Sequence, residues 1–443
     1  MKSPQTVPEV APTGAPKLPK VLDDTLANGL RVLVVRKPGV PMVQARLRLA
    51  IGKPKNWGDG TIEGIASETI KTGTADRDQL AIASELQRLG GSLETHADNE
   101  DFVVFGNAVA SGLADYLRLV ADLLQNASHP RGEVDIQKAQ TAQGLAIAHS
   151  QPPVRARYAL LGRLFPGHPY GQDIPDPASV GAITAAQIRK FHSSTITPKG
   201  AVLVLVGDIA PARAMKAAHA AFGVWTGTRR ATTVPTPEPL AANPLLVVHQ
   251  PEAVQTNIRL GGRAVGRKDP LFPALQLAAL VLGGGFTSRL NHNLREDKGY
   301  TYGAFAGLSH NQMASYISIG ADVQTAVTAP ALVETLYEIG RIATTPVTED
   351  ELGAARRYLA GQLALSIQTQ AGLASYLASL TAQGLDLNYL RELPAATERV
   401  TVDDLQNVAS TFLSPAALSA VMVGDADVIG DAVGRLTPVE VMA

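Results

Sequence analysis

Hydrophobic and polar positions near the start of the chain predict two β-strands. The run "GLRVLVVRKP" (29–38) is rich in β-branched residues, and "MVQARLRLAIG" (42–52) alternates apolar and polar positions as a half-buried strand does. Helical spacing follows in "QLAIASELQRLGG" (79–91), which ends in two glycines, a common helix stop. We then expect a strand-like stretch over 92–109 and a long helical region over 111–165.

The pattern of the first half returns in the second half. Residues 183–208 predict a helix, a proline turn and a buried strand that ends in Gly-Asp, and residues 400–425 repeat this order without a gap. At a constant offset of 217 residues, Thr184 matches Thr401, and each threonine is placed to cap its helix. A repeat of this length indicates a duplication into two similar domains rather than a solenoid.

A change in composition separates the two halves. Residues 226–244 hold four prolines and repeated threonines without periodicity, which predicts a linker. We therefore divide the chain into a flexible tail (1–20), a first domain (21–225), this linker and a second domain (245–440). Strands mixed with paired long helices, without regular strand–helix–strand alternation, predict that each domain is α+β, with an antiparallel-rich sheet packed with helices.

Composition excludes several classes of function. The 443 residues carry a net charge of −1, so no basic surface favours nucleic acid or an anionic membrane. The chain has no cysteine, which excludes disulfides, thiolate zinc sites and thiol catalysis. The longest apolar run, 274–282, is about half the length of a membrane-spanning helix. The proline-rich N-terminus does not resemble a signal peptide, but such tails also follow cleaved signals, so both periplasm and cytoplasm stay open.

One stretch at the start of the second half suggests chemistry. Residues 286–297 have helical spacing, Gly299 stops that helix, and 300–307 alternate as a strand. Arg295 then lies in the last turn of the helix and Tyr302 on the strand that leaves it. A guanidinium and a phenol O–H are both donors, and side by side they suit a carbonyl oxygen that gains negative charge. The alternative is a surface run of charges beside a core tyrosine.

The same stretch resembles the Arg/Tyr motif of the M16 family, which includes pitrilysin, insulysin and the mitochondrial processing peptidase. In that family an arginine and a tyrosine seven residues apart follow a glycine-rich turn, as Gly283, Gly284 and Gly285 precede the pair here. The resemblance implies that Arg295 and Tyr302 bind carbonyl oxygens of a peptide substrate. It also implies that the three glycines let a substrate or partner backbone approach closely.

Further stretches extend the resemblance over residues 20–440. "NGLRVLVV" (28–35) resembles the usual first strand of the family, and "FPGHPYG" (165–171) resembles a loop of its first domain. The duplicated α+β half is the family's unit. The resemblance therefore implies the LuxS/MPP-like metallohydrolase fold.

The zinc site of active M16 members has no counterpart in this sequence. Those members carry His-x-x-Glu-His on a helix, where the histidines share a face, bind zinc and flank the general base. Alignment on the Gly-Thr pair that follows this motif puts Gly64 and Glu68 at the histidine positions and Ser67 at the glutamate position. Gly144 lies near the expected third ligand, and the first histidine of the chain is His96. We therefore expect this chain to bind no zinc.

Three histidines are further functional candidates. "HADNED" (96–101) places His96 and two acids on one face of a predicted strand, which suggests a metal site, although a solvated strand end is the plainer interpretation. His292 is expected to lie at the surface, with a substrate-facing role as the alternative. His168 is expected to organise its loop.

The resemblance is to the non-catalytic subunit of a bacterial two-subunit M16 peptidase. It implies a heterodimer in which a homologous partner with His-x-x-Glu-His supplies zinc, water and general base, so that this chain is inactive alone. One alternative is a structural scaffold subunit of the same fold, which has no need of the Arg/Tyr pair. Another is an active homodimer with an unrecognised metal site.

Overall fold

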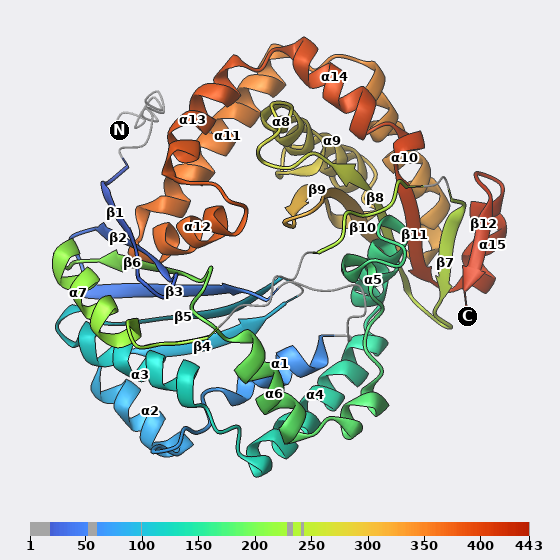
Figure 1. Cartoon of the computed structure of the whole chain (residues 1–443). Helices are drawn as coiled ribbons and strands as arrows, with labels where there is room; N and C mark the ends of the chain where they lie inside the picture. Colours follow the sequence, from blue (N-terminus) through green and yellow to red (C-terminus); the bar gives the residue numbers. More distant parts are fainter. Residues whose placement is uncertain (1–17, 52–59, 99, 228–233, 241–242, 443) are drawn as a thin grey trace, which may run out of the picture.

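A computed structural model describes the protein over residues 18–51, 60–98, 100–227, 234–240 and 243–442. Most of the predicted tail and part of the predicted linker lie outside these residues. Figure 1 shows two sheets packed with helices, one built from the blue-to-green half of the chain and the other from the yellow-green-to-red half. The predicted α+β fold with two similar units is confirmed, whereas the domain boundaries stay a prediction.

The first sheet has six strands in the order β1-β2-β6-β3-β5-β4. β3 pairs antiparallel with β5 and β6, whereas β2 and β6 run parallel. Its strands are β1 (Val21–Thr25), β2 (Arg31–Arg36), β3 (Met42–Ala50), β4 (Ser92–Ala97), β5 (Asp101–Val109) and β6 (Val202–Gly207). The helices of this half are α1 (Thr61–Thr69), α2 (Gln79–Arg88), α3 (Leu113–Asn126), α4 (Arg131–Ser150), α5 (Pro152–Leu164), α6 (Ala185–Thr195) and α7 (Pro211–Phe222).

The second sheet also has six strands, in the order β12-β7-β11-β8-β10-β9, so β9 lies at an edge. Within the described part of the chain, no helix is both long and apolar enough to cross a membrane. The strands are β7 (Leu245–His249), β8 (Gln255–Ala264), β9 (Thr301–His310), β10 (Ser315–Gln324), β11 (Ser419–Gly424) and β12 (Val439–Met442). The helices are α8 (Phe272–Gly283), α9 (Arg289–Asn291), α10 (Thr328–Thr344), α11 (Glu349–Gln368), α12 (Gln370–Ala382), α13 (Leu387–Arg399), α14 (Val402–Phe412) and α15 (Ala426–Gly434).

The sequence repeat corresponds to a structural repeat. Thr184 and Thr401 each cap their helix, α6 or α14, through a capping box with the residue three positions on. Each helix leads to a strand, β6 or β11, that holds the same place in its sheet. The sheets differ at one edge, since β1 comes from the start of the chain and β12 from its end.

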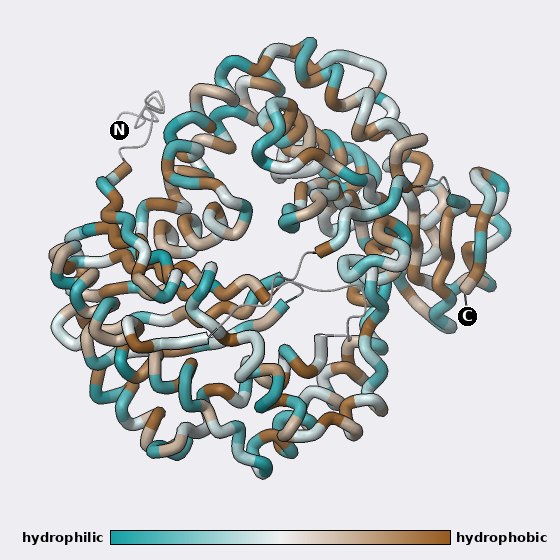
Figure 2. The backbone as a smooth tube through the Cα atoms, in the orientation of Figure 1, coloured by the Kyte–Doolittle hydropathy of each residue, from teal (hydrophilic) through white to brown (hydrophobic). Residues whose placement is uncertain are grey.

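The two halves exchange a helix, which the sequence did not reveal. α12 of the second half packs on the first sheet, where Leu373 and Leu377 join the same buried cluster as Val35 and Val204. α5 of the first half packs on β8 and β11 of the second sheet in the same way. Figure 1 shows both helices lying against the opposite half, and Figure 2 shows hydrophobic segments along the strands that they cover. Each sheet is therefore enclosed only when both halves are present.

Two predicted stretches each divide into several elements. The strand-like stretch 92–109 is two strands, because the Asp98 carboxylate accepts the backbone N–H groups of Glu100 and Asp101 and so closes a turn between β4 and β5. The helical region 111–165 is three helices, α3, α4 and α5. Pro130 and Pro152 stand at the starts of α4 and α5, where the fixed φ of proline fits a helix start and its ring prevents continuation from the preceding helix.

Candidate functional site

The segment that carries Arg295 is less regular than the sequence predicted. Instead of one α-helix over 286–297, a single turn of α9 runs into a π-helix over His292–Asp297. The backbone N–H of Lys298 donates to the carbonyl of Asn293, five residues back, at 3.0 Å. Gly299 then takes φ +66°, which a glycine adopts without strain, and ends the helix as predicted. π-helical turns are rare and occur often at functional sites.

Tyr302 lies on a β-bulge at the start of β9. Thr301 pairs with Val323 and Ala304 with Ala321, so two residues of β9, Tyr302 and Gly303, face a single residue of β10. The Thr301 hydroxyl holds the bulge, because it lies 2.9 Å from the carbonyl oxygen of Gly303 and 3.2 Å from its backbone nitrogen. A bulge redirects side chains, and here it leaves Tyr302 91% exposed.

Asn291 ties the helical segment to the strand that carries Tyr302. Its buried side-chain amide donates to the carbonyl of Ala304 at 2.7 Å and accepts the backbone N–H of the same residue at 2.9 Å. The amide also donates to the carbonyl of Gly285 at 3.1 Å. The glycine turn, the helix and the strand are thereby held together by one side chain.

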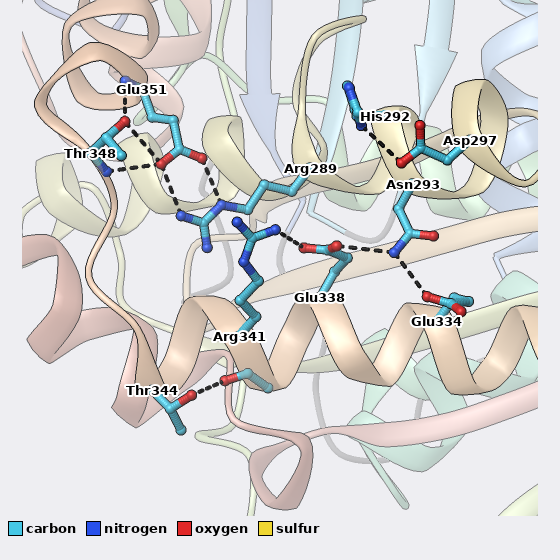
Figure 3. A network of polar contacts seen from close by, with 11 residues as sticks. Arg289, His292, Asn293, Asp297, Glu334, Glu338, Arg341, Thr344, Thr348 and Glu351 are labelled. Carbon is cyan, nitrogen blue, oxygen red and sulfur yellow. Dashed lines mark hydrogen bonds and ion pairs between the residues drawn. The ribbon is translucent and has the colours of Figure 1, made fainter.

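Polar contacts also anchor the segment to α10 and α11 (Figure 3). Arg289, buried, donates to both carboxylate oxygens of Glu351 at 2.7 and 2.9 Å. The hydrogen bond from Arg289 is the main reason why the pKa of Glu351 falls to about 2. Asn293 donates to Glu334 and Glu338 of α10, each at 3.0 Å. The backbone around Arg295 is therefore fixed from two sides.

The structure brings Arg295 and Tyr302 together, as the sequence predicted. The guanidinium carbon of Arg295 lies 5.1 Å from the centre of the Tyr302 ring and 4.1 Å from the centre of the Phe286 ring. Both distances fit cation–π contacts, so two exposed aromatic rings hold the guanidinium. Because Tyr302 is 91% exposed, the alternative of a core tyrosine is wrong. Sequence reasoning missed Phe286, although its place directly after the glycine run was visible.

This arrangement suits an acceptor that comes from outside the chain. Arg295 keeps 27% of its side chain exposed, and its only ion pair among the described residues is with the neighbouring Glu296 at 3.5 Å. The phenol of Tyr302 makes no hydrogen bond within the described residues. Both groups are donors on an exposed sheet edge, so a carbonyl oxygen could accept from both.

The glycine run has different neighbours at each position. A side-chain carbon on Gly283 would lie 2.4 Å from the backbone nitrogen of Ala306, so Gly283 lets α8 approach β9 of the same chain. A carbon on Gly284 would meet Leu280 of its own helix at 2.5 Å. At Gly285 the nearest atom, in Tyr358, would be 4.0 Å away. Only Gly285 faces open space, so only there does the predicted access for another chain have room.

Among the residues that the structure describes, the position of the family's zinc site holds no set of metal ligands. Gly64, Ser67 and Glu68 lie on α1, as expected; Ser67 donates to the carbonyl of Gly64 at 2.8 Å, and Glu68 pairs with Lys71 at 3.2 Å. Side-chain carbons on Gly64 or on Gly144 of α4 would meet nothing within 4 Å. A cavity of about 460 Å³ opens beside Gly64. His96 and Asp98 also line this cavity, but the described residues form no group of three possible ligands there, and Glu68 is already paired with a lysine. This arrangement does not fit zinc, which needs three or four nitrogen, sulfur or oxygen ligands.

The stretch "HADNED" does not build a metal site either. β4 ends at Ala97, so the expected shared strand face of 96, 98 and 100 does not form. Asp98 closes the turn, and buried Asp101 pairs with Arg48. His96 remains exposed.

One other group of possible metal ligands occurs among the described residues, formed by His249, Asp425 and Asp427. Nδ1 of His249 accepts the backbone N–H of Ala426 at 3.1 Å. The Asp425 carboxylate accepts two further backbone N–H groups. These contacts explain the cluster as the start of α15.

Two histidines behave as predicted. Nδ1 of His168 accepts the backbone N–H of Tyr170 at 3.1 Å, and its Nε2 lies 2.8 Å from the carbonyl of Pro235, so His168 organises its loop. His292 lies at the surface, 3.3 Å from Asp297.

Comparison with known proteins gives a consistent picture. The family described as "Peptidase M16 inactive domain" matches residues 182–359. A protein of Mycobacterium tuberculosis named as an uncharacterized zinc protease is 26% identical over 401 residues, which cover 88% of this chain and 90% of the relative. A similarly named protein of Streptomyces coelicolor is 21% identical and covers 88% of this chain and 86% of its own length.

Solved structures share the architecture of most of the chain. The M16 inactive domain from Pseudomonas fluorescens superimposes with a TM-score of 0.84 at 25% identity, covering 91% of this chain and 98% of that one. A protease from Helicobacter pylori gives a TM-score of 0.83 at 20% identity, covering 92% and 100%, and at that identity it supports the fold alone.

Proposed function

The chain belongs to the M16 peptidase family, and on that premise we propose that it is the non-catalytic, substrate-binding subunit of a heterodimeric zinc peptidase. In this proposal Arg295 and Tyr302 donate hydrogen bonds to a carbonyl oxygen of a bound peptide near the bond that is cut. A homologous partner with His-x-x-Glu-His supplies the zinc, the water and the general base.

The observation that carries the proposal is the exposed donor pair. Tyr302 is 91% exposed with its ring beside Arg295, although an aromatic side chain normally gains free energy from burial. Fixed donors aimed at a developing oxyanion need no reorganisation during the reaction, and losing one typically costs a hundredfold or more in rate, on the order of 3 kcal/mol. Such a role gives a reason to keep the pair in a chain that has Gly64 and Glu68 where the family's zinc-binding histidines stand.

The proposal is tested first by purification and then by substitution. Affinity purification from the native lysate, with mass spectrometry, should yield a partner of comparable amount that carries His-x-x-Glu-His. In the reconstituted complex, Tyr302→Phe keeps the ring beside Arg295 and removes only the O–H, and Arg295→Ala removes the guanidinium. Each variant should lower peptide hydrolysis about a hundredfold while the complex still forms by gel filtration.

Matched controls separate this effect from general damage. Tyr337→Phe changes an exposed tyrosine of α10, and Arg435→Ala changes an exposed arginine after α15. Neither should alter the rate. Full activity in both site variants would refute the donor role and leave the scaffold alternative. Hydrolysis by the chain alone, sensitive to a zinc chelator, would instead favour an active homodimer.

A further inference from the structure

Phe286 is an aromatic residue that the hydrophobic cores do not use. Its side chain is 62% exposed, and it belongs to none of the buried hydrophobic clusters among the described residues. Burial of a phenylalanine side chain normally stabilises a protein, so a ring left at the surface contributes little to folding. A phenyl ring also has no group that donates or accepts an ordinary hydrogen bond. Any role of Phe286 must therefore come from the contacts that its ring makes.

The backbone around Phe286 is fixed by hydrogen bonds. Phe286 follows Gly285 in a turn that is closed by a hydrogen bond from the N–H of Ser288 to the carbonyl of Gly285, at 3.1 Å. The Asn291 amide donates to the same carbonyl at 3.1 Å and also bonds to β9, the strand that carries Tyr302. One side chain therefore ties the turn of Phe286 to the strand of Tyr302. Because an aromatic side chain has few rotatable bonds, the ring is held with little loss of entropy.

The guanidinium of Arg295 is the group that contacts this ring. Its carbon lies 4.1 Å from the centre of the Phe286 ring, which is closer than the 5.1 Å to the centre of the Tyr302 ring. Among the described residues, its only ion pair is with the neighbouring Glu296, at 3.5 Å. An arginine side chain loses much rotamer freedom when it is held in one place, and a cation–π contact offsets part of that loss. Without the Phe286 ring, we expect the guanidinium to leave Tyr302 more often.

We propose that Phe286 is a positioning residue, whose ring holds the Arg295 guanidinium beside Tyr302 so that both donors reach the same peptide carbonyl oxygen. This inference rests on the donor role proposed above for Arg295 and Tyr302. Donors stabilise a developing negative charge only from the correct position, so a loosened guanidinium slows the chemical step. A cation–π contact at an exposed site favours the held position about two- to fivefold. Loss of the ring should therefore lower kcat by about the same factor.

Two substitutions at Phe286 separate the aromatic ring from apolar bulk. Phe286→Leu keeps an apolar side chain without an aromatic face, and Phe286→Tyr keeps the ring. In the reconstituted complex, kcat and KM are measured with a fluorescence-quenched peptide built on a bond that the complex cuts in casein. Phe286→Leu should lower kcat about two- to fivefold with KM unchanged, and Phe286→Tyr should keep the wild-type values. The control Tyr337→Leu, which removes an exposed ring from α10, should change neither.

The double variant Arg295→Ala/Phe286→Leu tests whether Phe286 acts through Arg295. Once the guanidinium is absent, loss of the ring should cause no further decrease in rate, so the two effects should not add. A further decrease in the double variant, or a higher KM at unchanged kcat in Phe286→Leu, would show that the ring contacts the peptide directly and would overturn the inference.

The same variants separate this inference from the donor role on which it rests. Full activity of Phe286→Leu beside an impaired Arg295→Ala would overturn the positioning role and leave the donor role intact. Full activity of Arg295→Ala would refute the donor role itself and the positioning role with it. Gel filtration should show each variant in the complex, because Phe286 lies outside the hydrophobic clusters of the described residues.

Discussion

A chain of hydrogen bonds through two buried histidines should make the first half sensitive to acid. His129 Nδ1 lies 2.8 Å from the Thr69 hydroxyl, His129 Nε2 lies 2.7 Å from His192 Nδ1, and His192 Nε2 lies 2.8 Å from the carbonyl of Leu124. A carbonyl only accepts, so His192 donates from Nε2 and accepts at Nδ1. When both rings are neutral, His129 donates from Nε2 and accepts at Nδ1 from the Thr69 hydroxyl, which also lies 2.7 Å from the carbonyl of Ile65. Burial of the two rings, more than this pattern of bonds, favours their neutral form.

The size of the effect follows from the shift at His129. Burial, then the charges of His192 and Arg189, lower the pKa of His129 to about 3. In the unfolded chain the pKa is about 6.5, so the unfolded state takes up a proton first as the pH falls. The free energy by which neutral His129 favours the folded state is complete above about pH 6.5. Below that pH it declines by about 1.4 kcal/mol per pH unit. Between pH 7 and pH 5, His129 alone should therefore cost about 2 kcal/mol. Burial lowers the pKa of His192 in the same direction.

The variant His129→Asn isolates this contribution. His129 has φ +42°, a left-handed conformation that asparagine tolerates better than most residues. Urea unfolding followed by circular dichroism at pH 7 and pH 5 should show the wild type losing about 2 kcal/mol more than His129→Asn over this interval. His96→Asn, a change at an exposed histidine, should keep the wild-type pH dependence. If wild type and His129→Asn lose the same free energy, the neutral-pair argument is wrong.

Three further outcomes follow from the geometry. Gly283→Ala should lower the free energy of unfolding by about 2 kcal/mol because its new carbon would meet Ala306, whereas Gly285→Ala should have little effect. Thermal melting of both variants tests this prediction. Equal melting temperatures would contradict the predicted contact. Glu351→Gln should cost about 3 kcal/mol in urea unfolding because buried Arg289 loses its counter-charge, and a loss below 1 kcal/mol or so would contradict this account. The two halves, expressed apart, should each fail to melt cooperatively but copurify when coexpressed, since α5 and α12 each cover the other half's sheet. A cooperative transition in either isolated half would refute that dependence.

Local signals in the sequence predicted much of the fold. β6 and β11 were predictable because each is an apolar run between a proline turn and Gly-Asp, and α6 and α14 because a threonine begins each one. The exchange of α5 and α12 was not predictable in the same way. A helix with an apolar face needs a partner, but hydrophobic periodicity does not say which sheet provides it. Whether a helix covers the sheet of its own half or that of the other half depends on surfaces far apart in the sequence. No local pattern in one sequence shows this.

At the candidate site, too, local sequence patterns predicted some positions of single residues and missed others. The seven-residue spacing and the helix stop at Gly299 predicted that Arg295 lies close to Tyr302. The structure confirms this proximity. The bulge that turns Tyr302 outward was missed, although Gly303 inside a strand pattern was a usable signal for it. Asn291 was also missed, because a polar residue on a short helix gives no sign that its amide reaches a strand 13 residues later.

Irregular backbone at the Arg/Tyr pair contrasts with regular backbone on α1, where the family's zinc motif would lie, and this contrast bears on function. Arg295 comes from a π-helix and Tyr302 from a bulge, both of which give up regular backbone pairing. Hydrogen bonds of the Asn291 and Thr301 side chains hold these irregular segments in place. A scaffold gains nothing from a stabilised irregular segment that ends in an exposed tyrosine, whereas a binding site gains a fixed donor pair. α1, by contrast, is an ordinary helix with Gly64 and Glu68 where the two histidines of the family motif would stand. The irregular local geometry is therefore found at the pair that would meet a substrate.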